Sequence, residues 1–110
     1  MLEPGRDLDV EIGKKIIKVM IVLDNDQQYK VVSTKTKIPG LLPFYSTHLP
    51  HAHMLVNFLQ HQGYFCKLGS ETINGDLQFY CKFFKENQEE DITYGITMPH
   101  AIALAALKTI

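Results

Sequence analysis

The spacing of hydrophobic residues near the N-terminus predicts an amphipathic helix over residues 6–20, RDLDVEIGKKIIKVM. Asp7 is placed to cap its first turn, and its lysines fall late, which agrees with the helix dipole. Gly13 is unfavourable inside a helix, so we expect it to mark the close approach of a neighbouring segment. The hydrophobic positions recur every three or four residues, as one buried helix face requires: Leu8, Ile12, Ile16 and Val19.

A second helix is predicted over residues 46–63, where Ser46 or Thr47 would supply the cap. Pro50 suits the first turn, because the N–H groups there have no partner within the helix. Gly63 follows the last turn and favours its end. The positions predicted to face the core are Leu49, Ala52, Val56 and Leu59.

A third helix is predicted over residues 97–110, TMPHAIALAALKTI, with Thr97 as its cap and Pro99 in its first turn. Its many alanines indicate a helix that packs closely against its neighbours. The positions available for burial are Ile102, Ala105, Ala106 and Ile110.

Strands are predicted where hydrophobic and polar residues alternate. The first is short, YKVVST at residues 29–34. Two aromatic strands, YFCKL and LQFYCKFF, flank Asn74-Gly75, a pair that is typical of two-residue hairpin turns. In LQFYCKFF, Phe79, Cys81 and Phe83 fall on one face of the sheet. A last strand, ITYGIT, follows the charged connection KENQEED at residues 85–91.

The predicted order of elements is α-β-α-β-β-β-α, with the proline-containing residues 35–44 as a loop. We therefore predict one α+β domain over residues 1–110. In it, three helices pack on a small, mainly antiparallel sheet, as an α/β/α-type sandwich. A face of the strand meander that the helices leave uncovered would suit a two-fold homodimer.

Composition narrows the class of protein. Hydrophobic residues make up 45% of the chain and charged residues 21%, as in globular rather than disordered proteins. The formal net charge is -1, so no overall positive field attracts nucleic acid, and we disfavour that partner. The sequence contains neither a signal-peptide pattern nor an apolar run as long as a membrane span. We expect a cytoplasmic protein whose two cysteines stay reduced.

Histidines cluster at the start of the second predicted helix, in His48-Leu49-Pro50-His51-Ala52-His53. On a helix, residues 48 and 51 share a face, whereas His53 points elsewhere. Zinc requires at least three protein ligands, and no acidic residue is near in sequence, so we predict no metal site. Neither Cys66 nor Cys81 has a neighbouring base, and nucleophile and phosphate-loop motifs are absent, so we assign no catalytic residue and no cofactor.

The starts of the second and third predicted helices form a candidate binding site. Free N–H groups and about half a positive charge at a helix start attract anions, and a histidine there can donate to a phosphate or carboxylate. Plain capping explains the same residue types without a ligand, so both interpretations stay open. The candidate residues are Ser46, Thr47, His48, His51, Thr97 and His100.

The aromatic residues of the two central strands also allow two interpretations. They would form a platform on which bases stack, or they would be buried as core beneath helices on both faces of the sheet. Acidic residues offset the charge of the lysines between them, so we favour the core. The residues in question are Tyr64, Phe65, Phe79, Tyr80, Phe83 and Phe84.

Three stretches, taken in order, resemble the phage alpha-beta-alpha sandwich domain, a family of small bacteriophage and prophage proteins. The stretches are RDLDVEIGKKIIKV, PFYSTHLPHAHMLVNFL and TMPHAIALAALKTI, and they span nearly the whole chain. This chain has His48 where the family usually has aspartate, and Val19 and His53 where it often has tryptophan. The family has no agreed biochemical activity, so the resemblance implies a fold and an origin rather than a reaction.

The resemblance and the missing catalytic set together predict a phage or prophage accessory protein in the bacterial host cytoplasm. We expect a non-catalytic binding or inhibitor module that acts on a host protein. One alternative is a protein that sequesters a small nucleotide or another anionic ligand at the helix starts. Further alternatives are a metal-dependent enzyme and a nucleic-acid accessory protein.

Overall fold

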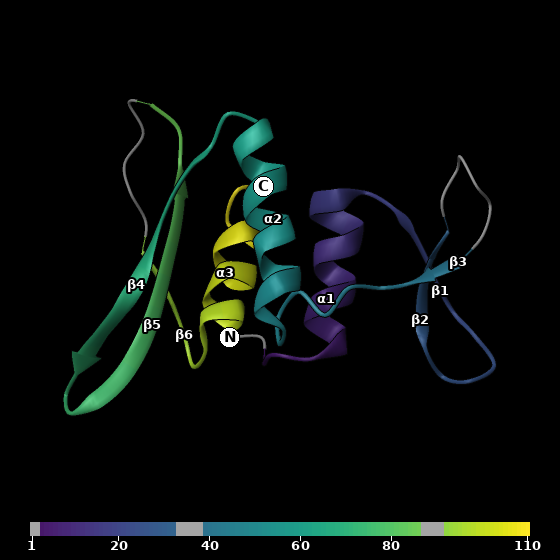
Figure 1. The fold of residues 1–110 in the computed structure, drawn as a ribbon, viewed down its shortest axis with the longest axis horizontal. Helices are drawn as coiled ribbons and strands as arrows, with labels where there is room; N and C mark the ends of the chain where they lie inside the picture. The colour runs from purple at the N-terminus through teal and green to yellow at the C-terminus, as the bar shows by residue number, and fades with distance from the viewer. Residues whose placement is uncertain (1–2, 33–38, 87–91) are drawn as a thin grey trace.

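The computed structural model describes residues 3–32, 39–86 and 92–110. Parts of the predicted strand 29–34, loop 35–44 and connection 85–91 therefore lie outside the described residues. Three α-helices form a central layer between two three-stranded antiparallel sheets (Figure 1). The α+β class and the antiparallel pairing are confirmed. The layer order differs from the predicted sandwich, because the strands form two sheets and the helices lie between them.

The first helix is shorter than its hydrophobic pattern suggests. Helix α1 (Arg6–Ile12) continues as a single π-helical turn, η1 (Gly13–Ile17), and ends at Lys18, whose φ of 62° is left-handed. The predicted cap at Asp7 is wrong, because Gly5 occupies the N-cap position and Asp7 is exposed. The expectation for Gly13 is confirmed: a Cβ there would lie 2.5 Å from Cδ1 of Ile21.

The first sheet contains β1 (Met20–Leu23), β2 (Tyr29–Val32) and β3 (Pro39–Leu41) in that order. Strand β1 begins inside the predicted first helix, and β3 lies inside the predicted loop. Three side chains of this sheet, Ile21, Tyr29 and Val31, pack against the core. The sheet thus attaches to the helical layer along one face only.

Helices α2 (Leu49–His61) and α3 (Met98–Leu107) match their predicted positions, and both have proline in the first turn. The core-facing residues of α2 are Ala52, Leu55, Val56 and Leu59. Leu49 was predicted to be buried but is 42% exposed, because it is the first residue of α2. Ile110 is 68% exposed, because it follows the end of α3.

The second sheet contains β4 (Phe65–Ile73), β5 (Asp76–Phe84) and β6 (Thr93–Gly95). Strands β4 and β5 form an unbroken nine-pair ladder that is closed by Asn74 (φ 52°) and Gly75 (φ 85°), the conformation that the sequence predicted. The inner face of β5 carries Phe79, Cys81 and Phe83, as predicted. Helix α3 packs closely against β6 of this sheet, because a Cβ on Gly95 would lie 2.5 Å from the backbone nitrogen of Ala101.

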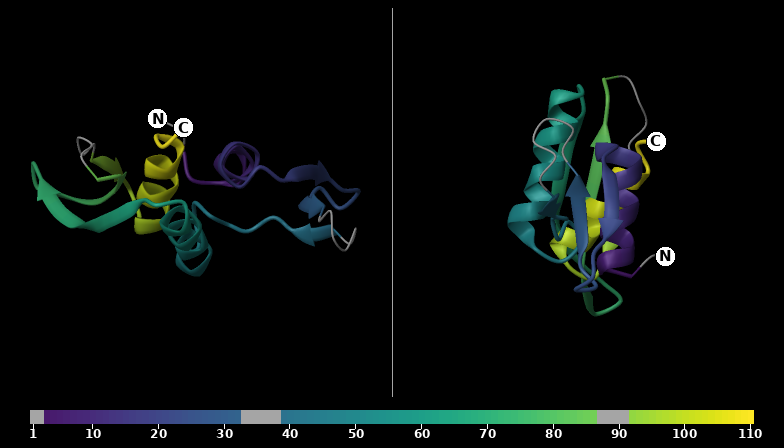
Figure 2. Two further views of the ribbon diagram at one scale, coloured as in Figure 1. Left: turned by 90° about the horizontal axis from the view of Figure 1, so that it is seen from above. Right: turned by 90° about the vertical axis from the view of Figure 1, so that its right-hand side faces the viewer.

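All three helices run in the same direction, as the colour gradient in Figures 1 and 2 shows. Because neighbouring parallel helices cannot be joined by a short turn, each connection returns along the length of a helix. The first sheet forms the connection from α1 to α2, and the second sheet forms the connection from α2 to α3. The resulting molecule is long and thin, with extents of 45 × 32 × 20 Å.

Candidate functional site

A network of buried polar groups joins the start of α1 to the segment before α2. The side chain of Asp9 is fully buried and accepts from Nη1 of Arg6 at 2.8 Å. It also accepts from the backbone nitrogen and Oγ of Ser46, at 2.8 and 2.7 Å. Oγ of Ser46 in turn accepts from the backbone nitrogen of Gly5 at 2.9 Å. A buried carboxylate is stable only with such partners, so this network fixes how the two segments meet.

Arg6 extends the network toward Phe44. Its guanidinium donates to the carbonyl oxygens of Leu42 at 2.7 Å and Pro43 at 3.2 Å. The guanidinium carbon also lies 3.9 Å from the centre of the Phe44 ring, a cation–π contact. The buried Tyr45 follows, and its burial, together with the charge of Asp9, raises the pKa of its hydroxyl. Arg6 thus holds the chain in place just before α2 begins.

The histidines at the start of α2 stack on Phe44. The rings of His48 and His51 lie 5.7 Å apart, which confirms that these two residues share a face. Nδ1 of His51 accepts from the backbone nitrogen of Phe44 at 2.7 Å, so a neutral His51 carries its proton on Nε2. Nδ1 of His48 lies 2.9 Å from Oγ1 of Thr47. Each ring therefore has one nitrogen occupied by the chain itself.

The predicted cap of α2 is wrong. His48 occupies the N-cap position without a side-chain cap bond, and the hydroxyl of Ser46 turns toward Asp9 instead. At the start of α3 the predicted cap is confirmed, because Oγ1 of Thr97 accepts from the backbone nitrogen of His100 at 3.3 Å. The His100 side chain is buried, and its Nδ1 accepts from the backbone nitrogen of Ile96 at 3.2 Å.

The six candidate residues therefore divide into two groups. Ser46 and His100 are buried and bonded within the chain, whereas Thr47, His48, His51 and Thr97 lie partly or fully at the surface. Helices α2 and α3 pack side by side and start at the same end of the molecule (Figure 1). The cap bond of Thr97 at α3 and the hydrogen bonds within the chain before α2 use much of their polar capacity, so these residues are accounted for without a ligand.

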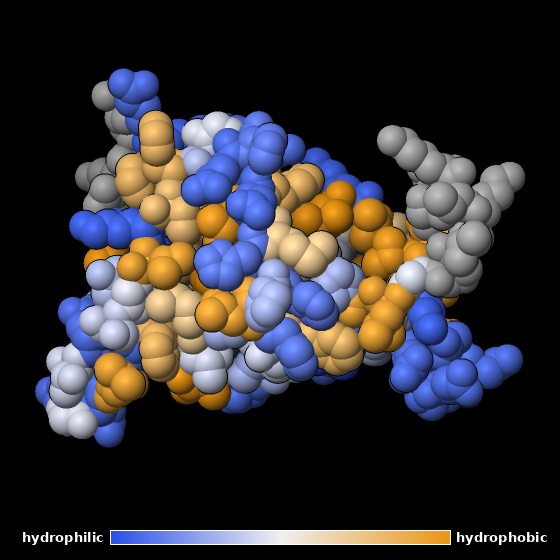
Figure 3. Space-filling view, viewed as in Figure 1, coloured by the Kyte–Doolittle hydropathy of each residue, from blue (hydrophilic) through white to orange (hydrophobic). Residues whose placement is uncertain are grey.

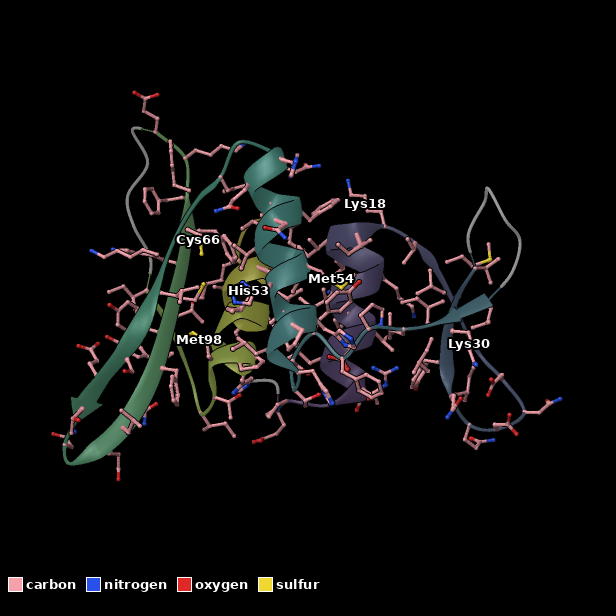
Figure 4. The ribbon with its side chains drawn as sticks, in the orientation of Figure 1. Lys18, Lys30, His53, Met54, Cys66 and Met98 are labelled. Carbon is pink, nitrogen blue, oxygen red and sulfur yellow. The ribbon has the colours of Figure 1, made fainter. Side chains whose placement is uncertain are left out.

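The two thiols lie close together between the second sheet and the helices. Sγ of Cys66 is 4.0 Å from Sγ of Cys81, and Cys66 points from β4 toward the helical layer (Figure 4). The hydrogen bond between them, with burial, raises the pKa of Cys81, and the same bond lowers the pKa of Cys66. Within residues 3–32, 39–86 and 92–110, no group of three or more histidine, cysteine or acidic side chains is arranged to hold a metal ion.

The outer face of the second sheet, defined by Phe65, Tyr80, Phe84 and Tyr94, carries aromatic rings that no described helix covers. The rings of Phe65 and Phe84 stack at 5.7 Å, and those of Tyr80 and Tyr94 meet edge-on at 6.5 Å. The prediction of a core role is wrong for Phe65, which is 55% exposed, because helices cover only one face of this sheet. It is confirmed for Phe79 and Phe83, which pack against the core from the inner face.

Tyr94 was not among the aromatic residues considered from the sequence. Its hydroxyl donates to Oε1 of Glu71 at 2.5 Å across the sheet, a bond that raises the pKa of Tyr94. The alternation in ITYGIT was the available signal, because it places Tyr94 on the face opposite Thr93.

A cavity of about 420 Å³ opens beside β6 and the end of α3. One polar atom near it, Oγ1 of Thr93, is buried and has no hydrogen-bond partner among the described residues. That hydroxyl is shielded from solvent, so the surface that the cavity presents is mostly apolar. The lining residues are Ile92, Thr93, Tyr94, Leu104, Leu107 and Lys108.

Comparison of the chain with protein families, with characterised proteins and with solved structures gave no match. The resemblance to the phage sandwich domain therefore stays a prediction. No helix in the described part of the chain combines the length and the apolar character that a membrane span requires.

Proposed function

We propose that this protein is a non-catalytic binding module that docks on a protein partner through the outer face of its second sheet. The observation that carries the proposal is the set of aromatic rings on that face, which no described helix covers. Tyrosine and phenylalanine are enriched at protein interfaces, where they contribute large apolar areas for little loss of side-chain entropy. Figure 3 shows hydrophobic residues reaching the surface on the side of the β4–β5 hairpin.

The charges on this face favour a protein over a nucleic acid. On this face Lys67 and Lys82 are offset by Glu71 and Asp76, and the whole chain has a formal net charge of -1. A surface that binds single-stranded nucleic acid combines stacking rings with an excess of positive charge along the strand. This face has the rings but not that excess.

We further propose that the partner is a bacterial host protein and that the chain is a phage or prophage accessory protein. Support comes from the resemblance of three ordered stretches to the phage sandwich family. The Arg6–Asp9–Ser46 network adds a physical reason for the first two stretches to occur together, because residues of one bond to a residue of the other. Sequestration of a nucleotide at the helix starts is less favoured, since Ser46 and His100 already bond within the chain.

Site-specific photo-crosslinking tests the proposal. A photoreactive phenylalanine analogue at Tyr94 is expected to capture a host protein from a bacterial lysate, and the same analogue at Tyr29 is the matched control. Both positions are half-buried tyrosines in strands, but Tyr29 lies in the first sheet. The captured protein is then purified and its affinity for the free chain is measured by calorimetry.

Substitution of Tyr80 by serine should weaken that affinity at least about tenfold, as expected for an aromatic residue at the centre of an interface. Met20→Ser, at a 67% exposed residue of the first sheet, should leave it unchanged. Equal capture from Tyr94 and Tyr29, or equal affinity of the Tyr80→Ser variant, would contradict the proposal. Salt-dependent binding of single-stranded DNA that is lost in Tyr80→Ser would instead assign the face to nucleic acid.

A further inference from the structure

Strand β4 is a long edge strand. It pairs with β5 on one side, and no described strand pairs with it on the other. Seven of its nine residues are exposed, and Cys66 and Gly69 are half-buried. Proteins usually protect such an edge with a proline, a bulge, a very short strand or charged side chains. Strand β4 has no proline, its ladder with β5 is unbroken over all nine residues, and its two charged residues, Lys67 and Glu71, have opposite signs.

The sequence of β4 is complementary to itself when two copies run antiparallel. If a two-fold axis passes through Gly69, all nine residues of each copy overlap. In that register Lys67 lies opposite Glu71 of the partner subunit, and Phe65 lies opposite Ile73 of the partner subunit. The symmetry repeats both pairs, which gives two charge pairs and two apolar pairs. Directly opposed residues of these kinds are the pairs that stabilise antiparallel strands.

Other registers lose this match. A two-fold axis at Leu68 would place Phe65 opposite Glu71 of the partner subunit, and an axis at Ser70 would place Lys67 opposite Ile73 of the partner subunit. An axis that passes between two residues shifts the pairing of the strands by an odd number of residues. The helical layers of the two copies would then lie on opposite sides of the joined sheet. The register with the longest overlap is therefore also the register with complementary charges.

We propose that the protein forms a two-fold homodimer in which the β4 strands of two copies pair antiparallel through Gly69. The pairing joins the two second sheets into one six-stranded sheet and satisfies backbone groups that each edge otherwise leaves to water. The short strand β6 remains the outer edge on each side. Because this register keeps both helical layers on one side of the joined sheet, the aromatic rings of both copies lie together on the other side. This inference is independent of the proposed function, whose tests use residues of β5 and β6.

Sedimentation velocity of the full chain tests the dimer. The wild type is expected to sediment as a species of about twice 12.6 kDa. Lys67→Glu places two like charges opposite each other in each symmetric pair, and it should weaken association at least about tenfold. Lys14→Glu makes the same change of charge on an exposed residue of η1, far from β4 in the fold, and should leave association unchanged.

A charge swap distinguishes strand pairing from a general effect of charge. Glu71→Lys alone should also weaken the dimer, and the double variant Lys67→Glu/Glu71→Lys should restore it, because opposite charges face each other again. Circular dichroism confirms that each variant is folded. A wild type that is monomeric at every concentration, or a double variant no stronger than either single variant, would overturn the inference. Either result would leave the photo-crosslinking test of the partner unaffected.

Discussion

Replacement of Asp9 by asparagine removes a negative charge from a position that water does not reach, while the shape of the side chain is kept. The remaining carbonyl oxygen of the amide can still accept from the backbone nitrogen and hydroxyl of Ser46. The new NH₂ group would then face the guanidinium of Arg6, so that two donors oppose each other. The structure therefore predicts the loss of the ion pair with most of the packing intact.

The expected cost follows from the burial of the two partners. Breaking a buried ion pair typically costs about 3–5 kcal/mol, because one charge is left without compensation. The Arg6 side chain is 26% exposed and keeps contact with water, so we expect the lower end, about 3 kcal/mol. This is a large share of the roughly 5–15 kcal/mol by which domains of this size are stable.

Urea denaturation, followed by circular dichroism, measures this cost. With a slope of roughly 1–3 kcal/mol per molar urea, the midpoint for Asp9→Asn should fall by about 1–3 M. Asp7→Asn is the matched control, because it makes the same change at an exposed position of the same turn. Ser46→Ala should also destabilise, and the double variant should lose less than the sum of the two, since both act on one network. Equal midpoints for the Asp9 and Asp7 variants would refute the role of the network.

Further predictions concern the two sheets and their attachment to the core. Alkylation at neutral pH, read by mass spectrometry, should modify Cys66 well before Cys81, because the lowered pKa of Cys66 gives thiolate at lower pH while the raised pKa keeps Cys81 protonated. Gly95→Ala should cost about 1–3 kcal/mol in thermal unfolding, because its Cβ would meet the backbone of Ala101. Gly69→Ala should cost less, since the Tyr80 side chain that it meets can turn aside. Hydrogen exchange should be faster in the first sheet than in the β4–β5 ladder, because few side chains attach that sheet to the core.

Local patterns predicted the elements that local interactions determine. Helices α2 and α3, the Asn74-Gly75 turn and the faces of β5 all follow from residue spacing and turn chemistry. Strand β1 was missed because Ile16 and Val19 continue the helical spacing, whereas the left-handed backbone at Lys18 ends the helix. The β-branched run before Leu23 was the signal that could have revealed the strand.

The candidate site was less predictable, because its contacts join distant parts of the chain. Asp9 and Ser46 are separated by 37 positions, and no periodicity relates them. A serine before a helix is ordinarily read as a cap, but here a buried carboxylate draws its hydroxyl away. The exposure of Phe65 depends on which face of the sheet the helices cover, and residue spacing alone does not specify this.

The common direction of the three helices has a consequence for how the chain reaches this structure. Helices α1 and α3 are in contact although they lie near opposite ends of the chain, so they meet only after both intervening meanders have closed long loops. Loop closure costs entropy before any contact between the helices repays it. We therefore expect the protein to refold in roughly milliseconds to seconds, as sheet-rich domains do, although its core is made mainly of helices. The β4–β5 hairpin, whose strands are joined by a two-residue turn, would be the first part of either sheet to form.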